Sequence, residues 1–194
     1  MKLRILVHIC CAPCALFCFP HLKKEFSEVM GLWYNPNIHP YTEYKKRLDS
    51  VKKWAEKLGE RVIYDERYEL QRFLREVVYR ESFRCTICYS LRLEKTAIFA
   101  RHGNFDFFTS TLLASPHQNQ DLIREIARAI GKKYNVKPYL VCFKDGWRES
   151  REISRQMGLY HQSYCGCIYS EEERYAPSCT FREKKMQEGE SRDF

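Results

Sequence analysis

The sequence predicts an α/β protein with a mainly parallel five-stranded sheet and helices on both faces. Short apolar runs typical of buried strands alternate with amphipathic helical segments. The 194 residues can bury a core within one domain, which we place at residues 1–177, followed by a polar tail at 178–194. Few glycines and prolines, together with 44% hydrophobic residues, exclude disordered and collagen-like classes.

Elements in the first half follow from apolar runs and helix-end signals. The LRILVHI run is typical of a buried strand, and Pro13 suits the first turn of the next helix. Gly59 ends a charged amphipathic helix. In chain order we expect strand 3–9, helix 15–26, strand 29–34, a stiff loop at 35–40, helix 41–58, strand 61–64 and helix 70–79.

The second half continues the alternation. We expect a helix opened by Cys85 and Cys88 and running to about residue 101, strand 105–109, polar loop 109–119, helix 120–134, strand 138–143 and a last clear helix at 148–157. Ligands of such sheets bind at the carboxyl ends of the strands, where the strand order reverses. The turn at Cys10 follows the first strand and is therefore the first place to look for a site.

Ten cysteines in one chain exceed ordinary cytosolic usage. The apolar stretch at residues 5–20 is interrupted by His8, Pro13 and four cysteines, and it is too short to span a bilayer. We therefore expect a cytoplasmic protein with no membrane partner. Thiols stay reduced there, so clustered cysteines favour metal binding or catalysis.

Eight cysteines fall in three groups, at residues 10–18, at Cys85 and Cys88, and at Cys165 and Cys167. A C-x-x-C spacing at a helix start places both sulfurs on one side of a turn and favours thiolate. Two converging pairs would supply four soft ligands for zinc or an iron–sulfur cluster. Cys10 and Cys11 are adjacent and follow a core strand. A domain of this size does not need a structural zinc ion to stabilise it. We therefore favour an iron–sulfur cluster over zinc and over a metal-free dithiol.

The Cys165-Gly-Cys167 segment has a C-x-C spacing, unlike the C-x-x-C spacing of Cys85 and Cys88. One intervening residue in an extended chain points both sulfurs to the same face, and Gly166 allows the backbone to tighten. A disulfide there would be strained and easily reduced, which suits electron transfer or regulation. We expect Cys18 and Cys142 to be buried apolar residues and Cys179 to be incidental, and Cys14 stays open between the cluster region and helix packing.

The charge indicates a polyanionic partner. The chain carries a net charge of +8, and residues 72–101 hold seven Lys or Arg against three Glu around Cys85 and Cys88. Aromatic residues are interleaved with these charges. Because basic groups neutralise phosphates and aromatic faces stack on extruded bases, this pattern favours an RNA substrate, with Arg84 and Arg92 as candidate tRNA contacts.

Five motifs occur in order along the chain: HICCAPC at residues 8–14, NPNIHP at 35–40, RCTICYSLRLEKTA at 84–97, a stretch at 105–119 with TSTL and SPHQN, and YHQSYCGCIYS at 160–170. Together they resemble the QueH family of epoxyqueuosine reductases over about residues 3–170. The tail after Glu173 does not share the resemblance.

The resemblance implies a fold similar to the adenine-nucleotide alpha-hydrolase type. Its nucleotide-binding relatives carry a glycine-rich phosphate loop, and a Cys-rich turn replaces that loop here, so we expect no ATP use. The resemblance also implies a cobalamin-independent enzyme with a [4Fe-4S] cluster on Cys10, Cys11, Cys85 and Cys88. It further implies a redox-active pair of Cys165 and Cys167, and a second metal, iron or another divalent ion. Cys14 is a candidate ligand for that second metal.

The activity implied is the last step of queuosine formation, reduction of epoxyqueuosine at the wobble position of tRNA. Two electrons remove the epoxide oxygen as water, and the electron donor is not identified by the sequence. Position alone suggests His8, His117, Tyr164 or Asp106 as the proton donor, although a structural role is the more frequent one for each. Tyr89 and Tyr164 are candidates for stacking on the extruded base.

Two other functions stay open at this point. One is a non-catalytic, zinc-bound RNA-binding module in which the cysteines only shape a basic surface. The other is a cluster-bearing, ATP-dependent tRNA sulfurtransferase, which the absence of a phosphate loop disfavours.

Overall fold

The computed structural model describes residues 2–141, 143 and 147–176. The predictions for Cys142, Cys179 and the tail at 178–194 lie outside these residues, and the domain boundary at 177 stays a prediction. No helix among the described residues is both long enough and apolar enough to cross a bilayer.

Five parallel strands form one sheet in the order β3-β2-β1-β4-β5, which confirms the predicted fold class. The strands are β1 (Arg4–His8), β2 (Glu28–Trp33), β3 (Val62–Tyr64), β4 (Phe107–Ser110) and β5 (Lys137–Pro138). β1 lies at the centre, where Ile5 pairs with Val29 on one side and Phe107 on the other. Four of its five residues are buried, so it forms the middle of the core.

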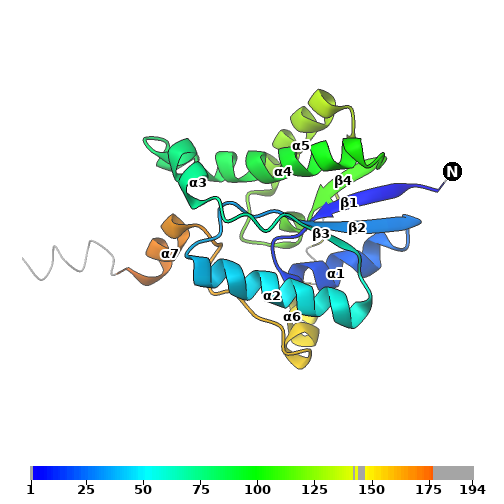
Figure 1. The fold of residues 1–194 in the computed structure, drawn as a ribbon, viewed down its shortest axis with the longest axis horizontal. Coiled ribbons are helices and arrows are strands. Elements are labelled where there is room, and N and C mark those ends of the chain that lie inside the picture. The colour runs from blue at the N-terminus through cyan, green and yellow to red at the C-terminus, as the bar shows by residue number, and fades with distance from the viewer. Residues whose placement is uncertain (1, 142, 144–146, 177–194) are drawn as a thin grey trace, which may run out of the picture.

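Helices cover both faces of this sheet (Figure 1). They are α1 (Ala12–Leu22), α2 (Tyr41–Leu58), α3 (Leu70–Val77), α4 (Arg84–His102), α5 (Gln120–Tyr134), α6 (Trp147–Gln156) and α7 (Ile168–Tyr175), with short 3-10 turns η1 (Glu81–Phe83) and η2 (Thr111–Ala114). α4 and α5 pack together on one face, and α1, α2 and α6 lie on the other. A parallel sheet requires this double cover because both of its faces are apolar.

The order of the strands fixes where a ligand can bind. From β1 the chain passes outward to β2 and β3, and it then returns to place β4 on the other side of β1. The connections therefore diverge at the carboxyl ends of β1 and β4, which leaves a crevice between them. The turn at Cys10 and η2 both begin at this crevice.

Three α-helices or strands differ by more than two residues from the sequence-based prediction. α1 spans Ala12–Leu22 and not 15–26, because Pro13 begins the helix and the chain must turn before β2. β5 has only the two residues Lys137–Pro138, where a strand at 138–143 was expected. α7 was missed because its residues are mostly polar and none is fully buried.

Candidate metal and redox site

Three cysteines meet at the carboxyl end of β1. The sulfurs of Cys10, Cys11 and Cys14 all lie within 4.8 Å of one another, and all three residues are buried. Cys11 is the N-cap of α1, so Cys14 in the first turn is brought back toward the two cysteines before it. This cysteine triad (Cys10, Cys11 and Cys14) is the densest group of soft ligands among the described residues.

The contacts within the triad lower the pKa of Cys10 and raise the pKa values of Cys11 and Cys14. The Thr111 hydroxyl donates to the Cys10 sulfur at 3.2 Å, and the Cys10 backbone N–H donates to the Thr111 oxygen at 3.0 Å. Hydrogen bonds from Cys11 and Cys14 lower the pKa of Cys10 well below its ordinary value, and they outweigh its burial. The hydrogen bond with Cys10 raises the pKa of Cys11 to about 12, and the hydrogen bonds with Cys10 and Cys11 raise the pKa of Cys14 well above its ordinary value. Because thiols bind metal as thiolates, a metal bound here would displace thiol protons.

The donor set fits a soft metal. Two thiolates on one tetrahedral ion with bonds of about 2.3 Å lie about 3.8 Å apart. The Cys10 and Cys11 sulfurs are 3.8 Å apart. The sequence left Cys14 open between the cluster region and helix packing, and the structure places its sulfur within 4.8 Å of the Cys10 and Cys11 sulfurs.

Cys85 and Cys88 lie outside the triad, in the first turns of α4. Cys85 is exposed and Cys88 is buried, and burial raises the pKa of Cys88 to about 12. A buried guanidinium, that of Arg92, donates to the Cys88 sulfur at 2.5 Å. Arg92 also interacts electrostatically with Cys10 and Cys165. Its positive charge therefore acts on one cysteine from each of the three groups.

Arg47 on α2 fixes the backbone of the Cys165–Cys167 segment through hydrogen bonds. The Arg47 guanidinium donates to the carbonyls of Cys165 at 2.9 Å and Tyr164 at 3.0 Å, and it pairs with Glu43 at 2.6 Å. Gly166 has a φ of +142° and lies against Arg47, where a Cβ would come within 3.2 Å of the guanidinium. Glycine is required at this position by the backbone and by the contact together.

The two sulfurs of this segment face different surroundings. Cys165 is exposed, and the Gln118 amide donates to its sulfur at 3.3 Å. Cys167 is buried at the start of α7, with its sulfur 3.5 Å from the Ser170 hydroxyl. Cys165 is therefore the member of the pair that an incoming substrate reaches first.

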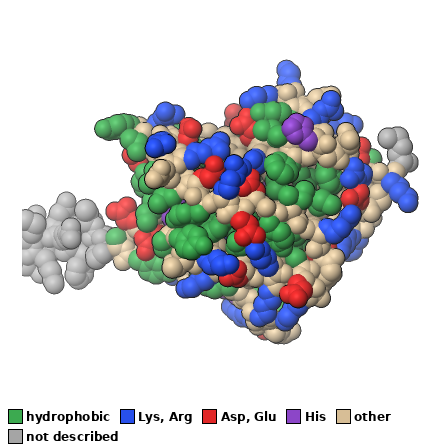
Figure 2. All heavy atoms as spheres, viewed as in Figure 1, with side chains coloured by type: hydrophobic (Ala, Val, Ile, Leu, Met, Phe, Trp, Pro, Cys, Tyr) green, Lys and Arg blue, Asp and Glu red, His purple; other side chains and the backbone are tan. Residues whose placement is uncertain are grey.

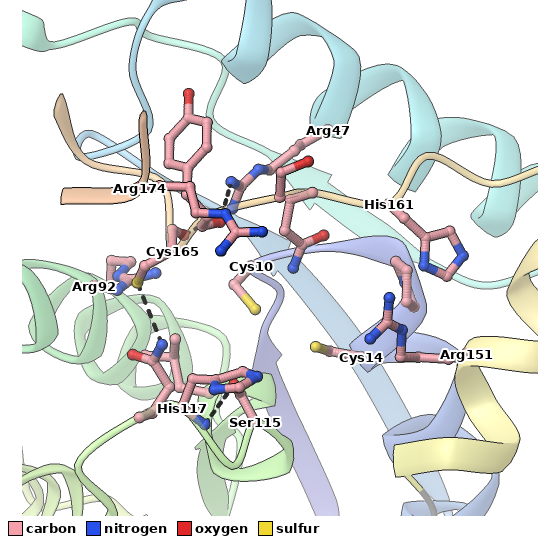
Figure 3. Close-up of a pocket in the computed structure, with 16 residues that line it drawn as sticks. Cys10, Cys14, Arg47, Arg92, Ser115, His117, Arg151, His161, Cys165 and Arg174 are labelled. Atoms are coloured by element: carbon pink, nitrogen blue, oxygen red, sulfur yellow. Dashed lines mark hydrogen bonds between the residues drawn. The ribbon is translucent and has the colours of Figure 1, made fainter. Parts of the chain in front are cut away.

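A pocket of about 590 Å³ connects these parts (Figure 3). Cys10 and Cys14 point into it from one side, and Cys165 and Arg92 lie opposite them. Its remaining lining includes Arg47, Arg151, Arg174, His117, His161, Gln118, Gln162 and Tyr164. A cavity with thiols at its base and cations in its walls suits an anionic substrate that is reduced there.

Arg84 and Arg92 are not on the open basic surface that their sequence context suggested. Arg92 is only 2% exposed, because its guanidinium lies beneath the cysteines. Arg84 pairs with Glu173 of α7 and lies over the Tyr169 ring. Tyr89 is also buried, with its hydroxyl bonded to Gln118 at 3.0 Å, which leaves no free face for a base.

Of the four candidate proton donors, two line the pocket and two do not. His8 is buried, its ring bonded to the Ser110 hydroxyl at 2.8 Å, and burial lowers its pKa to about 3. Asp106 accepts the backbone N–H of Arg4 at 2.8 Å, at the amino end of β4, which is the wrong end of the sheet. His117 and Tyr164 line the pocket. Tyr164 donates its hydroxyl proton to the His39 carbonyl at 2.5 Å, which leaves His117 better placed.

Sequence reasoning missed Arg47, Gln118, His161, Arg151 and Arg174 as part of the site. Gln118 lies in the SPHQN motif, and His161 lies in the YHQSYCGC motif. Membership of these motifs could therefore have identified both residues as part of the site. Arg47 is 118 residues from Cys165, and nothing local marks it as different from the other cations of α2.

Fold and site together define a class of protein: a Rossmann-like α/β domain whose switch-point crevice presents thiols in place of a phosphate-binding loop. A family profile described as "Epoxyqueuosine reductase QueH" matches residues 5–173. The chain therefore belongs to the QueH family.

Individual relatives agree with this assignment. An epoxyqueuosine reductase QueH of Dehalococcoides mccartyi is 35% identical over 176 residues, covering 90% of this chain and 96% of that protein. The one from Thermotoga maritima is 38% identical over 180 residues, covering 88% and 91%. Among solved structures, the U34-tRNA thiolase NcsA from Methanococcus maripaludis with its [4Fe-4S] cluster has a TM-score of 0.56 at 15% identity, covering 94% of this chain and 67% of that one. That likeness concerns the fold.

Proposed function

We propose that this protein reduces epoxyqueuosine to queuosine at the wobble position of tRNA. The observation that carries the proposal is the pocket into which Cys10 and Cys14 of the cysteine triad face Cys165, in a chain that belongs to the QueH family. The named activity of its relatives requires a reductive centre and a polyanionic substrate, and this pocket offers thiols and cations for both.

The reaction balances with a dithiol as the source of electrons. Opening the epoxide to an alkene consumes two electrons and two protons and releases the oxygen as water. Oxidation of Cys165 and Cys167 to a disulfide supplies two electrons and two protons, and an external donor must then reduce the pair again. The difference in exposure assigns Cys165 the outer position and Cys167 the inner one.

The cysteine triad supports a bound metal cofactor, because its three sulfurs lie within 4.8 Å of one another. We infer that Cys10, Cys11, Cys85 and Cys88 hold a [4Fe-4S] cluster, and that Cys14 contributes to a second metal, iron or another divalent ion. When bound at these cysteines, such a group would supply one-electron transfer and Lewis-acid polarisation of the epoxide oxygen. Neither ATP nor cobalamin has a role in this proposal.

The remaining residues bind, orient and protonate. Arg47 fixes the backbone beside Cys165, Arg92 places its charge among the cysteines, and Gln118 orients the Cys165 thiol. His117 is the side chain that we assign to protonate the departing oxygen. All of this chemistry suits a cytoplasmic enzyme acting on tRNA.

Anaerobically purified protein tests the proposal directly. Incubation with dithionite and tRNA carrying epoxyqueuosine should yield queuosine, detected by mass spectrometry of the digested nucleosides. His117→Gln should slow turnover while leaving the iron content unchanged. A colourless protein with one zinc per chain and no turnover would support the zinc-bound RNA-binding alternative instead.

A further inference from the structure

The turn between α3 and α4 displays apolar side chains to solvent. Tyr79 is 95% exposed and Phe83 is 65% exposed, and Val78 beside them is also exposed. Figure 2 shows hydrophobic side chains projecting at the end of the molecule where Figure 1 places α3, with Lys and Arg side chains next to them. We call Val78, Tyr79 and Phe83 the aromatic turn.

The backbone conformation and local hydrogen bonds keep the side chains of the aromatic turn exposed. Tyr79 has a φ of +60°, a left-handed conformation that is unfavourable for a bulky residue. Its backbone N–H donates to the Glu81 carboxylate at 3.1 Å, and the backbone N–H of Arg80 donates to the Val77 carbonyl at 2.7 Å. A strained residue that is fixed in an outward position points to a function, because no packing compensates for the strain.

Several arginines lie close in sequence to the Tyr79 and Phe83 rings, and two of them form no ion pair among the described residues. Residues 72–84 contain four arginines and two glutamates. Arg72 bonds with Glu69, and Arg84 bonds with Glu173. Within the described part of the chain, neither Arg75 nor Arg80 takes part in an ion pair, and both are exposed.

The aromatic turn adjoins the candidate site. Phe83 is the N-cap of α4, and the exposed Cys85 lies in the first turn of that helix. The intervening Arg84 contacts Glu173 and Tyr169 of α7, the helix that follows the Cys165–Cys167 segment. The aromatic turn therefore lies next to α4 and α7, which supply Arg92 and Arg174 to the lining of the pocket.

We propose that the aromatic turn is a stacking platform for unpaired nucleotides of the anticodon loop that flank the wobble base, with Arg75 and Arg80 on their phosphates. The inference rests on the proposed function, which brings a single-stranded RNA loop to this edge. Exposed rings interleaved with unpaired arginines are the combination by which proteins bind unpaired nucleotides, because every base has a face to stack. A purely apolar protein partner would leave the arginines desolvated and unpaired.

The experiment uses the full-length, anaerobically purified protein and two RNAs: an anticodon stem-loop and a blunt duplex of equal phosphate number. Tyr79→Asn removes the ring and keeps a residue that tolerates the left-handed backbone. Phe83→Ser replaces the other ring with a favourable N-cap. Leu58→Asn, an exposed apolar position at the far end of α2, is the matched control.

Each aromatic-turn variant should weaken stem-loop binding at least about fivefold, the lower end of what stacking of one base contributes. Duplex binding and the iron content should not change, and Leu58→Asn should bind like the wild type. The salt dependence separates the two kinds of contact. Loss of a ring leaves the slope of log affinity against log salt unchanged, whereas Arg75→Gln with Arg80→Gln lowers it by about 0.7 per lost phosphate contact.

The inference is overturned by unchanged stem-loop affinity in the Tyr79→Asn, Phe83→Ser double variant, or by equal losses for stem-loop and duplex. Weaker reduction by a protein electron donor with unchanged RNA binding would assign the turn to a protein partner and would also overturn it. Failure of the proposed function gives a different result, since the wild type would then not convert epoxyqueuosine even with dithionite as reductant.

Discussion

Among single side chains, Arg47 has the widest influence on the site. Its guanidinium is buried, pairs with Glu43 and fixes two carbonyls of the segment that carries Cys165. Glu43 in turn accepts the Tyr160 hydroxyl at 2.6 Å. A charge buried this deeply is stable only while its partner is present.

We therefore expect Arg47→Met to lower the free energy of unfolding by about 3–5 kcal/mol, because it leaves the Glu43 carboxylate buried and short of a partner. Glu43→Gln combined with Arg47→Met should recover part of that loss. Urea denaturation measures both variants. Loss of the exposed Arg155–Glu152 pair of α6 is the control and should cost no more than about 1 kcal/mol; equal losses at both sites would contradict this account.

The cysteines can be assigned one at a time. If Cys85 is a cluster ligand as proposed, Cys85→Ser should remove iron and acid-labile sulfide together. Cys14→Ser should leave the sulfide content unchanged and lower the iron content by at most about one per chain, if it binds the second metal. Iron and sulfide assays on anaerobic samples measure both. Loss of sulfide in Cys14→Ser would instead place Cys14 in the cluster.

Asp65 should make stability sensitive to acid. Hydrogen bonds from Arg67, with a contribution from Lys95, lower the pKa of Asp65 to about 2 from an ordinary value of 3.8. Its stabilising effect is therefore complete above pH 3.8 and is lost as the pH falls through about 2. Asp65→Asn should unfold at lower urea than the wild type at pH 6, and the difference should shrink below pH 3.8. A constant difference across this range would contradict the ion pair.

At the scale of elements, α2 and its end were predicted closely. The charged amphipathic run gives a helix over Tyr41–Leu58, and Gly59 ends it with a φ of +65°. A Cβ at Gly59 would meet nothing within 4 Å, so only the backbone conformation requires glycine.

Gly59→Ala should consequently lower stability by about 1 kcal/mol, the usual penalty for a left-handed alanine. Gly59→Asn should cost less, because asparagine tolerates this conformation. Thermal unfolding measured by circular dichroism checks both variants. Equal melting temperatures for alanine and asparagine would show that the backbone conformation is not what requires glycine here.

The elements that the sequence did not predict share a physical cause. β5 ends after two residues although the apolar run continues, because pairing with β4 and not hydrophobicity sets the length of a strand. α7 has few apolar residues, and it is held by contacts such as Arg84 with Glu173 that connect distant parts of the chain. Local pattern therefore identified strongly periodic elements and missed those defined by tertiary contacts.

Across the whole molecule, spacing identified the cysteine groups but not their arrangement. Cys10, Cys11 and Cys14 form the tight set, and Arg92 lies among all three groups where an open phosphate contact was expected. The strand order that creates the crevice depends on pairing between segments about a hundred residues apart, such as β1 with β4, and no local signal encodes it.

Metal removal should loosen the whole site at once. A metal that binds only the folded protein stabilises it, and the proposed ligands, Cys10 and Cys11 on one side and Cys85 and Cys88 on the other, come from separate elements. Chelation under anaerobic conditions should lower the melting temperature and speed hydrogen exchange at residues 10–14 and 84–92. The far end of α2 should exchange at an unchanged rate. Identical exchange in the metal-bound and metal-free protein would contradict a metal at these cysteines.

The contact between Arg47 and the Cys165 carbonyl also sets an order of events during synthesis. The ribosome delivers the cysteine triad within the first fifteen residues, Thr111 much later and Cys165 near the end of the described chain. Domains generally fold as units, so the growing chain carries reactive, unshielded thiols until the last pocket wall emerges. A chain stalled before Cys165 would therefore leave the cysteine triad open to oxidation in a way that the finished protein does not.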